Sequence, residues 1–173
     1  AREYLELFTI PKRPQIGEGN YTNYTEHDVI QAAKVFTGYK DKKDRTLRDS
    51  DTGIPRGYIS ENLHDISDKK FSAAFGNTII KGGTDKESIV QEHHDFVEMI
   101  FAQKATSISY VRKLYRFFVN SEWNESVEKD IIEPLAKDLR NNGYQLLPVL
   151  KRLLTSKHFY DEDDLKNTDN IIG

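Results

Sequence analysis

The sequence predicts a mainly α protein, an antiparallel helical bundle-like domain with a small irregular or β-hairpin insertion. From residue 84 onward, apolar residues recur three or four positions apart, which is the spacing of a helix face. Helix-start patterns occur at 25–28 and 84–87, where a hydroxyl is followed three residues later by a carboxylate. Residues 39–83 instead carry charge, glycine and proline without helical spacing, and we expect the insertion there.

Composition favours one folded domain over residues 1–173, with two small subdomains as the alternative, and excludes several functions. The chain has 173 residues, 37% of them hydrophobic and 31% charged, which is enough to bury a single core. It has no cysteine, so disulfides, thiolate metal sites and cysteine nucleophiles are excluded. The net charge of −3 gives no general attraction to nucleic acid, and no stretch approaches the roughly 20 apolar residues of a membrane span.

The first nine residues predict an amphipathic helix. One side is apolar and the other is charged, with Tyr4, Leu5, Leu7 and Phe8 opposite Arg2, Glu3 and Glu6. We expect the apolar side to dock on the domain's own core. Because a chain that opens on such a helix looks cut from a longer protein, we also expect the charged side to face a missing part of that protein.

Residues 11–23 are rich in proline, glycine and asparagine and predict a loop, followed by a helix over 25–37 that ends at Gly38. A small hairpin is expected within 39–66, using β-compatible pieces at 46–47 and 58–59. A short helix over 68–75 should end at Gly76, and an extended piece at 78–80 should lead into a turn at Gly82 and Gly83.

Four more helices are expected in the second half, over 84–102, 107–119, 125–142 and 146–157. The pattern Thr84 to Glu87 predicts a capping box at the first of them. Pro134 lacks the backbone N–H that a helix interior needs, so it either kinks the third helix or begins a new one.

Several motifs along the chain occur together in a specific combination. The opening Ala-Arg-Glu-x-x-Glu-Leu-Phe-Thr is one of them, and Thr37-Gly38-Tyr39 and His64-Asp65 are others. Further pieces lie along most of the chain, at Tyr24-Thr25, Asp28-Val29, Lys70, Phe75-Gly76, Arg112-Lys113-Leu114, Phe117-Phe118, Gly143-Tyr144, Leu153-Leu154-Thr155-Ser156 and Phe159. In combination these motifs resemble one large bacterial family, the domain of unknown function 1800.

The resemblance implies a protein exported from a bacterial cell, located in the periplasm or outside the cell. Members of this family are typically longer than this chain, and residues 170–173 resemble the start of a further segment. The resemblance therefore implies a C-terminal fragment, truncated at both ends, whose first partner is the remainder of its own chain. The family brings no established activity.

Two groups of residues are candidates for chemistry. Glu3 and Glu6 could form a carboxylate pair for acid–base work or for a hard metal, with Arg2 as the group that positions them. The alternative for these residues is a salt bridge. His64 and Asp65 could bind a divalent metal or orient a general base. The alternative for this pair is structural, with Asp65 closing a turn or capping a helix and His64 bonded to backbone.

Other polar motifs carry weaker hypotheses. Arg112 and Arg116 lie one helical turn apart and could grip a phosphate or carboxylate, although such faces are most often solvated. His93 is expected on the apolar stripe of its helix, while His94 points elsewhere and could share a metal only with Glu98. The turn at Gly82 and Gly83 is similar to an anion-binding turn but lacks the lysine of a phosphate loop.

Two hypotheses for function follow. The first is an uncharacterised helical module of an exported bacterial protein that serves binding or assembly at the cell envelope, with envelope proteins as partners and no cofactor evident. The second is a metal-dependent or acid–base hydrolase-like enzyme that uses Glu3, Glu6, His64 and Asp65, with a site completed by the missing N-terminal half. The second hypothesis requires that these four side chains converge in the fold.

Overall fold

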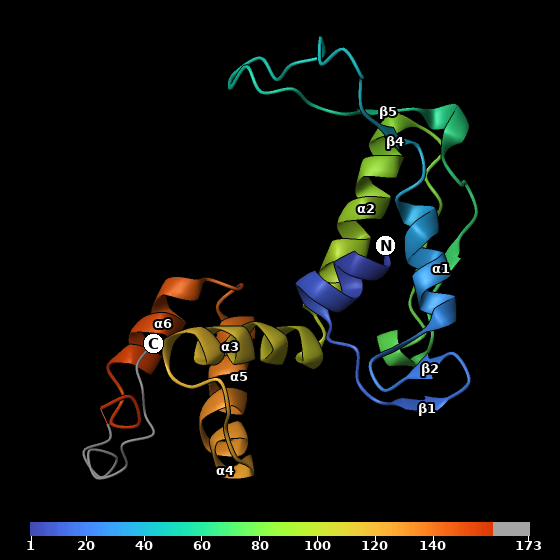
Figure 1. Ribbon diagram of the computed structural model, residues 1–173. Helices are drawn as coiled ribbons and strands as arrows, with labels where there is room; N and C mark the ends of the chain where they lie inside the picture. The colour runs from blue at the N-terminus through green and yellow to red at the C-terminus, as the bar shows by residue number, and fades with distance from the viewer. Residues whose placement is uncertain (161–173) are drawn as a thin grey trace. The chain divides into compact units, whose positions relative to one another are not determined.

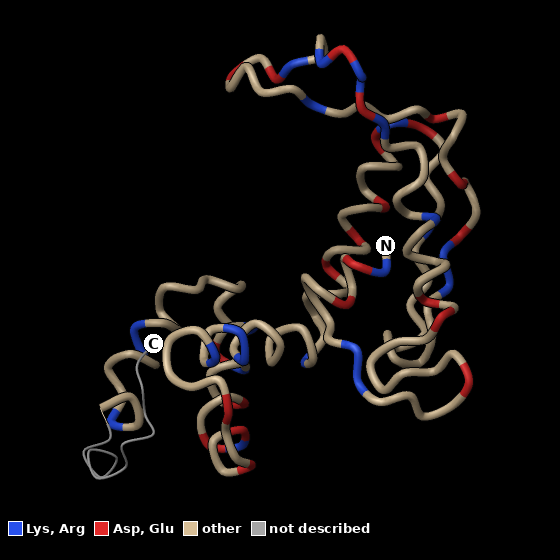
Figure 2. The backbone as a smooth tube through the Cα atoms, in the orientation of Figure 1, with Lys and Arg blue, Asp and Glu red and all other residues tan. Residues whose placement is uncertain are grey.

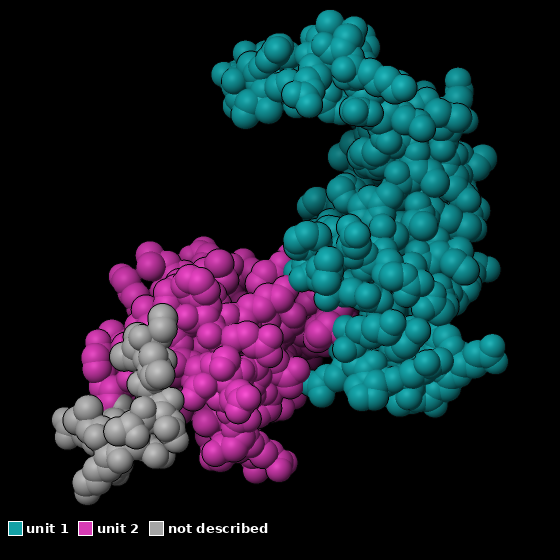
Figure 3. Space-filling view, viewed as in Figure 1, with its two compact units in different colours: residues 1–8, 12–100 teal, residues 9–11, 101–173 magenta. Residues whose placement is uncertain are grey.

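The computed structural model describes residues 1–160, and within them the chain divides into two compact units. Unit 1 comprises Ala1–Phe8 and Lys12–Ile100, and unit 2 comprises Thr9–Pro11 and the chain from Phe101 onward (Figure 3). The chain is mainly α with small antiparallel sheets, as expected (Figure 1). The single domain over 1–173 stays a prediction, and the segment noted at 170–173 lies outside the described residues.

Unit 1 combines two long helices with short strands. Its helices are α1 (Glu26–Val35) and α2 (Lys86–Phe101), with the π-helical η1 (Tyr4–Thr9) at the start of the chain. Two 3₁₀ turns are present, η2 (Glu61–Leu63) and η3 (Ala73–Phe75). The strands are β1 (Gln15–Gly17), β2 (Asn20–Tyr21), β3 (Tyr24–Thr25), β4 (Tyr39–Lys40), β5 (Tyr58–Ile59), β6 (Lys69–Lys70) and β7 (Ile79–Ile80).

These strands form three antiparallel sheets. The first has the order β1-β2-β3, and β4-β5 and β6-β7 are two-stranded. In the second sheet Tyr39 lies opposite Ile59 and Lys40 opposite Tyr58, so the chain between them leaves and returns at one place. The prediction of a loop at 11–23 missed β1 and β2 of the first sheet. Strands this short contain too few residues to show an alternating pattern.

The helix predicted over 25–37 is confirmed, with its cap. Thr25 Oγ1 accepts the Asp28 backbone N–H at 3.2 Å, while the Asp28 carboxylate accepts the Thr25 N–H at 2.7 Å. Gly38 then adopts a left-handed φ of 81°, and a Cβ there would lie 2.8 Å from the Ser60 carbonyl oxygen. Only glycine fits both that conformation and that close approach.

Two further predictions in unit 1, both on helix position, are wrong. The helix expected over 68–75 is β6 followed by η3, because Ser72 caps the short turn through the Ala74 N–H and Lys69 enters the interior. The cap of α2 is displaced by one residue from the predicted Thr84. Asp85 accepts the Ser88 N–H at 2.9 Å and the Ser88 hydroxyl accepts the Asp85 N–H at 3.1 Å, which is the same reciprocal arrangement.

The opening helix buries less than its sequence pattern predicts. Leu5 is 1% exposed and Tyr4 packs against the rings of Phe36 and Phe96, but Leu7 and Phe8 are exposed, Phe8 by 61%. The prediction that all four apolar residues dock on the core is wrong for these two. The segment is π-helical, and its i→i+5 hydrogen bonds widen the turn so that a stripe spaced for an α-helix no longer stays on one face.

Unit 2 consists of helices, namely α3 (Lys104–Phe118), α4 (Glu125–Val127), the π-helical η4 (Glu128–Ile132), α5 (Glu133–Asn141) and α6 (Leu146–Leu154). Pro134 lies in the first turn of α5, and Ile132 and Glu133 before it already have helical backbone conformation, so a π-helical turn rather than a break precedes the proline. The core joins one face of each of the longer helices, and its buried members are Ile108, Val111, Tyr115, Ile132, Leu135, Ala136, Leu139, Val149 and Leu153.

Candidate functional site

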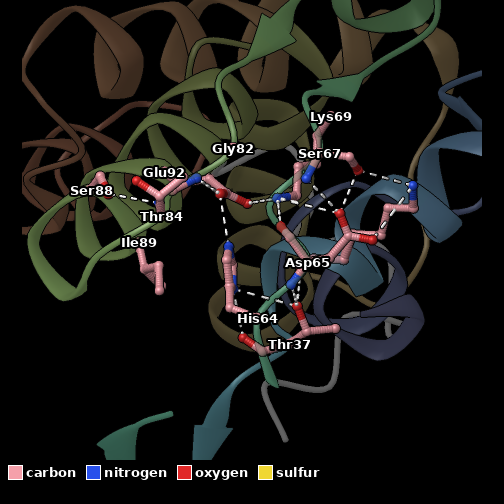
Figure 4. Close-up of polar contacts among 12 residues, drawn as sticks. Thr37, His64, Asp65, Ser67, Lys69, Gly82, Thr84, Ser88, Ile89 and Glu92 are labelled. Carbon is pink, nitrogen blue, oxygen red and sulfur yellow. Dashed lines mark hydrogen bonds and ion pairs between the residues drawn. The ribbon is translucent and has the colours of Figure 1, made fainter. Parts of the chain in front are cut away.

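A cluster of charged side chains lies inside unit 1, centred on Glu92 of α2 (Figure 4). Glu92 Oε2 lies 2.9 Å from His64 Nε2, and Oε1 lies 2.7 Å from Lys69 Nζ. All three side chains have 0% exposure. Ionised groups are rarely buried so deeply unless they are paired, so this cluster is the most unusual polar feature of the described chain.

Short elements and two glycines hold the cluster together. Gly83 donates its N–H to Glu92 Oε2 at 2.7 Å, and Gly82 donates to Asp68 Oδ1 at 3.3 Å. A Cβ on Gly82 would lie 2.1 Å from the Ile66 carbonyl oxygen, and one on Gly83 would lie 2.5 Å from the Ile89 nitrogen. The turn that is similar to an anion-binding turn thus donates its N–H groups to two of the protein's own carboxylates, those of Glu92 and Asp68.

Lys69 reaches the cluster from β6. Its ammonium donates to the Asp65 carbonyl oxygen and lies 4.0 Å from Asp65 Oδ1. Glu92 Oε1 is fully buried, and Lys69 is its counter-ion, with no aligned hydrogen-bond donor to that oxygen among residues 1–160. The Glu92 carboxylate is therefore held by the charge of Lys69 at Oε1 and by hydrogen bonds at Oε2.

His64 and Asp65 take the structural alternatives that the sequence left open. His64 Nδ1 lies 2.9 Å from the Thr37 carbonyl oxygen, so both ring nitrogens already have partners. Asp65 accepts the Ser67 N–H at 2.9 Å and also the Ser67 hydroxyl, and these hydrogen bonds hold the pKa of its carboxyl below the usual value. Neither nitrogen of the His64 ring is free to bind a metal in this arrangement, and a metal at this position stays a prediction.

Glu6 belongs to a different network at the opening helix. It accepts the Tyr24 hydroxyl and pairs with Arg2 at 3.4 Å, and Arg2 also forms a two-pronged pair with Glu26, with Nη1 3.0 Å from Oε1. The hydrogen bond from Arg2 lowers the pKa of Glu26, while burial and Glu6 raise that of Tyr24. This matches the salt-bridge alternative for Arg2 and Glu6.

The four candidate catalytic residues are not brought together by the described contacts. His64 and Asp65 lie in the Glu92 cluster, Glu6 lies in the Arg2 network, and Glu3 is exposed on the opening helix. Among residues 1–160, Glu6 and His64 share no hydrogen-bond partner. A shared acid–base site is therefore not formed by these side chains within the described chain.

In unit 2, Arg112 and Arg116 each contact a different side chain. Arg112 grips Glu128 with Nη2 2.7 Å from Oε1, and Trp123 donates its indole N–H to the same carboxylate at 2.8 Å. Arg116 lies over the Trp123 ring, 5.7 Å from its centre. The predicted joint grip on an external anion stays a prediction, since Arg112 already holds an internal one.

The remaining histidines of α2 follow the predicted division. His93 packs on the rings of Phe36 and Tyr39, and burial lowers its pKa. His94 is exposed and lies 3.5 Å from Glu98, and Asp95 brings a third ligand atom within 4.8 Å of theirs. Asp95 was not counted as a ligand from the sequence. The group lies on an open helix surface, where such clusters are common without a metal.

Sequence reasoning missed the two residues at the heart of the cluster, Glu92 and Lys69. A signal for Glu92 exists, because it stands three residues after Ile89 and four before Phe96, both buried on the apolar stripe of α2. A carboxylate in that position predicts a buried pair. Lys69 has no such signal. It was predicted to lie in a short helix, where its side chain could simply point to solvent.

A second feature of unit 1 is a long exposed segment, residues 41–57, which we call the arm (Figure 1). It leaves from β4 and returns to β5, and its tip is ordered by its own hydrogen bonds. Asp49 accepts the N–H groups of Asp51 and Thr52, and the Arg48 guanidinium donates to the Gly53 carbonyl oxygen at 2.7 Å. Lysine, arginine and aspartate alternate along it (Figure 2).

None of the helices in residues 1–160 has the length and apolar character needed to cross a membrane. Neither the curated proteins nor the solved structures contained a match to the chain. A family model described as protein of unknown function (DUF1800) matches residues 1–170. This match covers the Glu92 cluster, the arm and the helices of unit 2, and the chain belongs to the DUF1800 family.

Proposed function

We propose that this chain is a binding module of an exported bacterial protein, that it serves assembly at the cell envelope, and that the arm makes the contact with its partner. The observation that carries the proposal is the contrast between the arm and the charged groups of unit 1. The side chains best suited to chemistry are buried and paired with one another. Every residue of the arm except the half-buried Leu47 and Asp49 is exposed, and none of them belongs to the buried core.

The form of the arm supports a binding role. Long loops without helices or strands are uncommon in compact proteins, and many of them carry function. The tip is already ordered by the hydrogen bonds of Asp49 and by an isolated bridge between Arg48 and Pro55, so less conformational freedom is lost when a partner binds. Ile54 is exposed beside these charged groups and offers an apolar contact.

The location at the envelope rests on the family resemblance alone. Fractionation of cells that produce the full-length protein tests it, and we expect the protein in the periplasmic or extracellular fraction. Recovery from the cytoplasmic fraction alone would contradict this part of the proposal and leave the role of the arm open to its own test.

The role of the arm can be tested by removing it without disturbing its base. Because Lys40 lies opposite Tyr58 in an antiparallel pair, residues 41–57 can be replaced by Asn-Gly, which closes a two-residue hairpin turn. We expect this variant to fold and to lose the partner that the unaltered chain retains in crosslinking and pull-down from envelope fractions.

A matched control keeps the length of the arm and changes its chemistry. Replacing residues 42–52 by glycine and serine preserves the span and leaves Asp41 and Arg56 in place, but it removes the other charges of the arm and its ordered tip. Loss of the partner in both variants is the expected result. Equal binding by the unaltered chain and the Asn-Gly variant would rule out the arm as the contact surface.

A further inference from the structure

The Lys69–Glu92 pair places an amine against a carboxyl group in the interior of unit 1. Lys69 Nζ lies 2.7 Å from Glu92 Oε1, and both side chains have 0% exposure. Although the two atoms are this close, Nζ donates no aligned hydrogen bond to Oε1, and no other donor within residues 1–160 does so. The ammonium instead donates to the Asp65 carbonyl oxygen, which holds it in place. The two groups are therefore in contact without a hydrogen bond of normal geometry between them.

The two oxygens of the Glu92 carboxyl group have different surroundings. Oε2 accepts the Gly83 N–H at 2.7 Å and contacts His64 Nε2 at 2.9 Å. Oε1 has the Lys69 amine beside it. A backbone N–H at this distance stabilises negative charge that develops on an oxygen during a reaction. The carboxyl group is thus oriented with Oε2 as a carbonyl oxygen and Oε1 as the oxygen that is able to leave.

The Lys69 nitrogen is also close to the carbon of the same carboxyl group. Because a carbonyl carbon–oxygen bond is about 1.2 Å long, a nitrogen 2.7 Å from Oε1 lies at most about 4 Å from Glu92 Cδ. A small movement of the lysine side chain reaches the attack distance of about 3–3.5 Å. Reacting groups held in this way have effective concentrations of about 10⁵–10⁸ M.

We propose that Lys69 and Glu92 condense to an amide, an isopeptide bond that joins β6 to α2. One of the three ammonium hydrogens passes to Oε1, and the neutral amine attacks Cδ, so that the Nζ–Cδ bond forms and an electron pair moves onto Oε2. The electron pair then returns, the Cδ–Oε1 bond breaks, and Oε1 leaves as water with a second hydrogen from Nζ. The third hydrogen stays on the amide nitrogen. The reaction consumes no oxidant, reductant or other molecule.

Burial favours the product over the ion pair. Two charges are costly to keep in the interior, and a neutral amide is less costly. Ile89 and Phe96, which flank Glu92 on α2, are themselves buried, and an interior site limits the water that would hydrolyse the amide. After the reaction Asp65 keeps Lys34 as a counter-ion, at 3.7 Å. The chain has no cysteine, so a disulfide cannot join the same elements.

A second lysine pair in unit 1 has the same separation and serves as a control. Lys81 Nζ lies 2.7 Å from Asp68 Oδ2, but the two side chains are 83% and 36% exposed. Lys81 also donates an aligned hydrogen bond to that oxygen. Since water solvates both of these charges, nothing favours their condensation. We expect an amide at Lys69 and none at Lys81.

Peptide mapping of the full-length protein tests the proposal directly. Trypsin cleaves the denatured chain after free lysines and arginines but not after a lysine whose side chain is an amide. We expect residues 57–70 to be joined to residues 87–104, at the summed mass of the two peptides less one water. In Lys69→Arg, which keeps the positive charge but has no amine to condense, residues 87–104 should appear as a linear peptide. The result for the unaltered protein stands whether or not this variant folds.

Fragmentation of the joined peptide should place the bond between Lys69 and Glu92. Linear peptides alone from protein that is folded by circular dichroism would overturn the proposal. A loss of water within residues 57–70 would also overturn it, because Lys69 would then be bonded to Asp65. An additional amide at Lys81 would contradict the role of burial. None of these measurements involves the arm or a partner, so their outcome is independent of the proposed function.

Discussion

Two charged networks in unit 1 use the same kinds of side chain and differ in burial. Around Glu92, the His64, Lys69 and Glu92 side chains have 0% exposure. At the opening helix, Arg2 and Glu26 form an equally short pair but are 44% and 38% exposed. Water screens the second pair and can replace it when it breaks, whereas nothing replaces a partner lost inside the first. Contact distance alone therefore does not rank the two networks.

The same substitution in both networks gives the sharpest comparison and the largest expected effect. Glu92→Gln leaves the Lys69 ammonium and the His64 ring buried without their carboxylate, and we expect it to lower the free energy of unfolding by about 3–5 kcal/mol. Glu26→Gln should lower it by about 0–1 kcal/mol, because both groups stay solvated. Urea denaturation followed by circular dichroism measures both, and equal losses would show that burial does not separate the networks.

The next largest effect tests whether the glycine turn is required for the buried cluster. Gly82→Ala places a Cβ 2.1 Å from the Ile66 carbonyl oxygen, and the backbone must shift to relieve the contact. We expect a loss of about 1–3 kcal/mol. Gly17→Ala is the matched control, since its Cβ would meet Asn20 at an ordinary 3.7 Å. A change at Gly82 as mild as that at Gly17 would contradict the tight turn.

A smaller effect, of opposite sign, is expected from the arm. Replacing residues 41–57 by Asn-Gly should raise the free energy of unfolding by about 2 kcal/mol, since each doubling of loop length costs roughly 0.6 kcal/mol of closure entropy. The Tm from calorimetry should rise accordingly. A lower Tm would mean that the arm supports the core, which would weaken its description as an exposed binding element.

The smallest effect concerns acid. The hydrogen bond from Arg2 lowers the pKa of Glu26 in the folded chain, so this pair stabilises the fold above the unfolded pKa of about 4.3. That contribution is lost as the pH falls through the lowered folded value. We expect Arg2→Ala to remove at most about 0.5 kcal/mol at pH 7 and nothing at low pH, with 1 M salt reducing the difference further.

If Arg2→Ala instead produced the same loss at all pH values, the contribution of Arg2 would lie in packing rather than in charge. The titration of unfolding free energy for the two proteins, measured side by side, distinguishes these outcomes.

The sequence was most informative where one local rule acts without competition. The cap formed by Thr25 and Asp28 and the helix that follows it were both predicted from neighbouring residues. Errors arose where two local rules compete. Thr84 and Asp85 both suit a helix cap, and Ser88 selects Asp85 by returning its hydroxyl to the Asp85 N–H.

The candidate site was predicted only in part, for a related reason. His64 and Asp65 were singled out with their structural alternatives, and the anion-binding turn at Gly83 was noted. The partner that joins them, Glu92, is 28 residues from His64, and no local pattern specifies such a distant pairing. Its position on the apolar stripe of α2 was the available signal.

By itself, the sequence determined the helical character of the chain, its caps and turns and its family, because each depends on residue types at fixed short spacings. The tertiary structure alone decided which charges are buried and which are solvated. Glu92 and Glu26 are both glutamates on helices. The packing of β6 and of the Gly82-Gly83 turn around Glu92 removes its carboxylate from water, whereas the carboxylate of Glu26 stays solvated. Burial is a property of the whole fold, and it determines how strongly a charge contributes to the electrostatic energy.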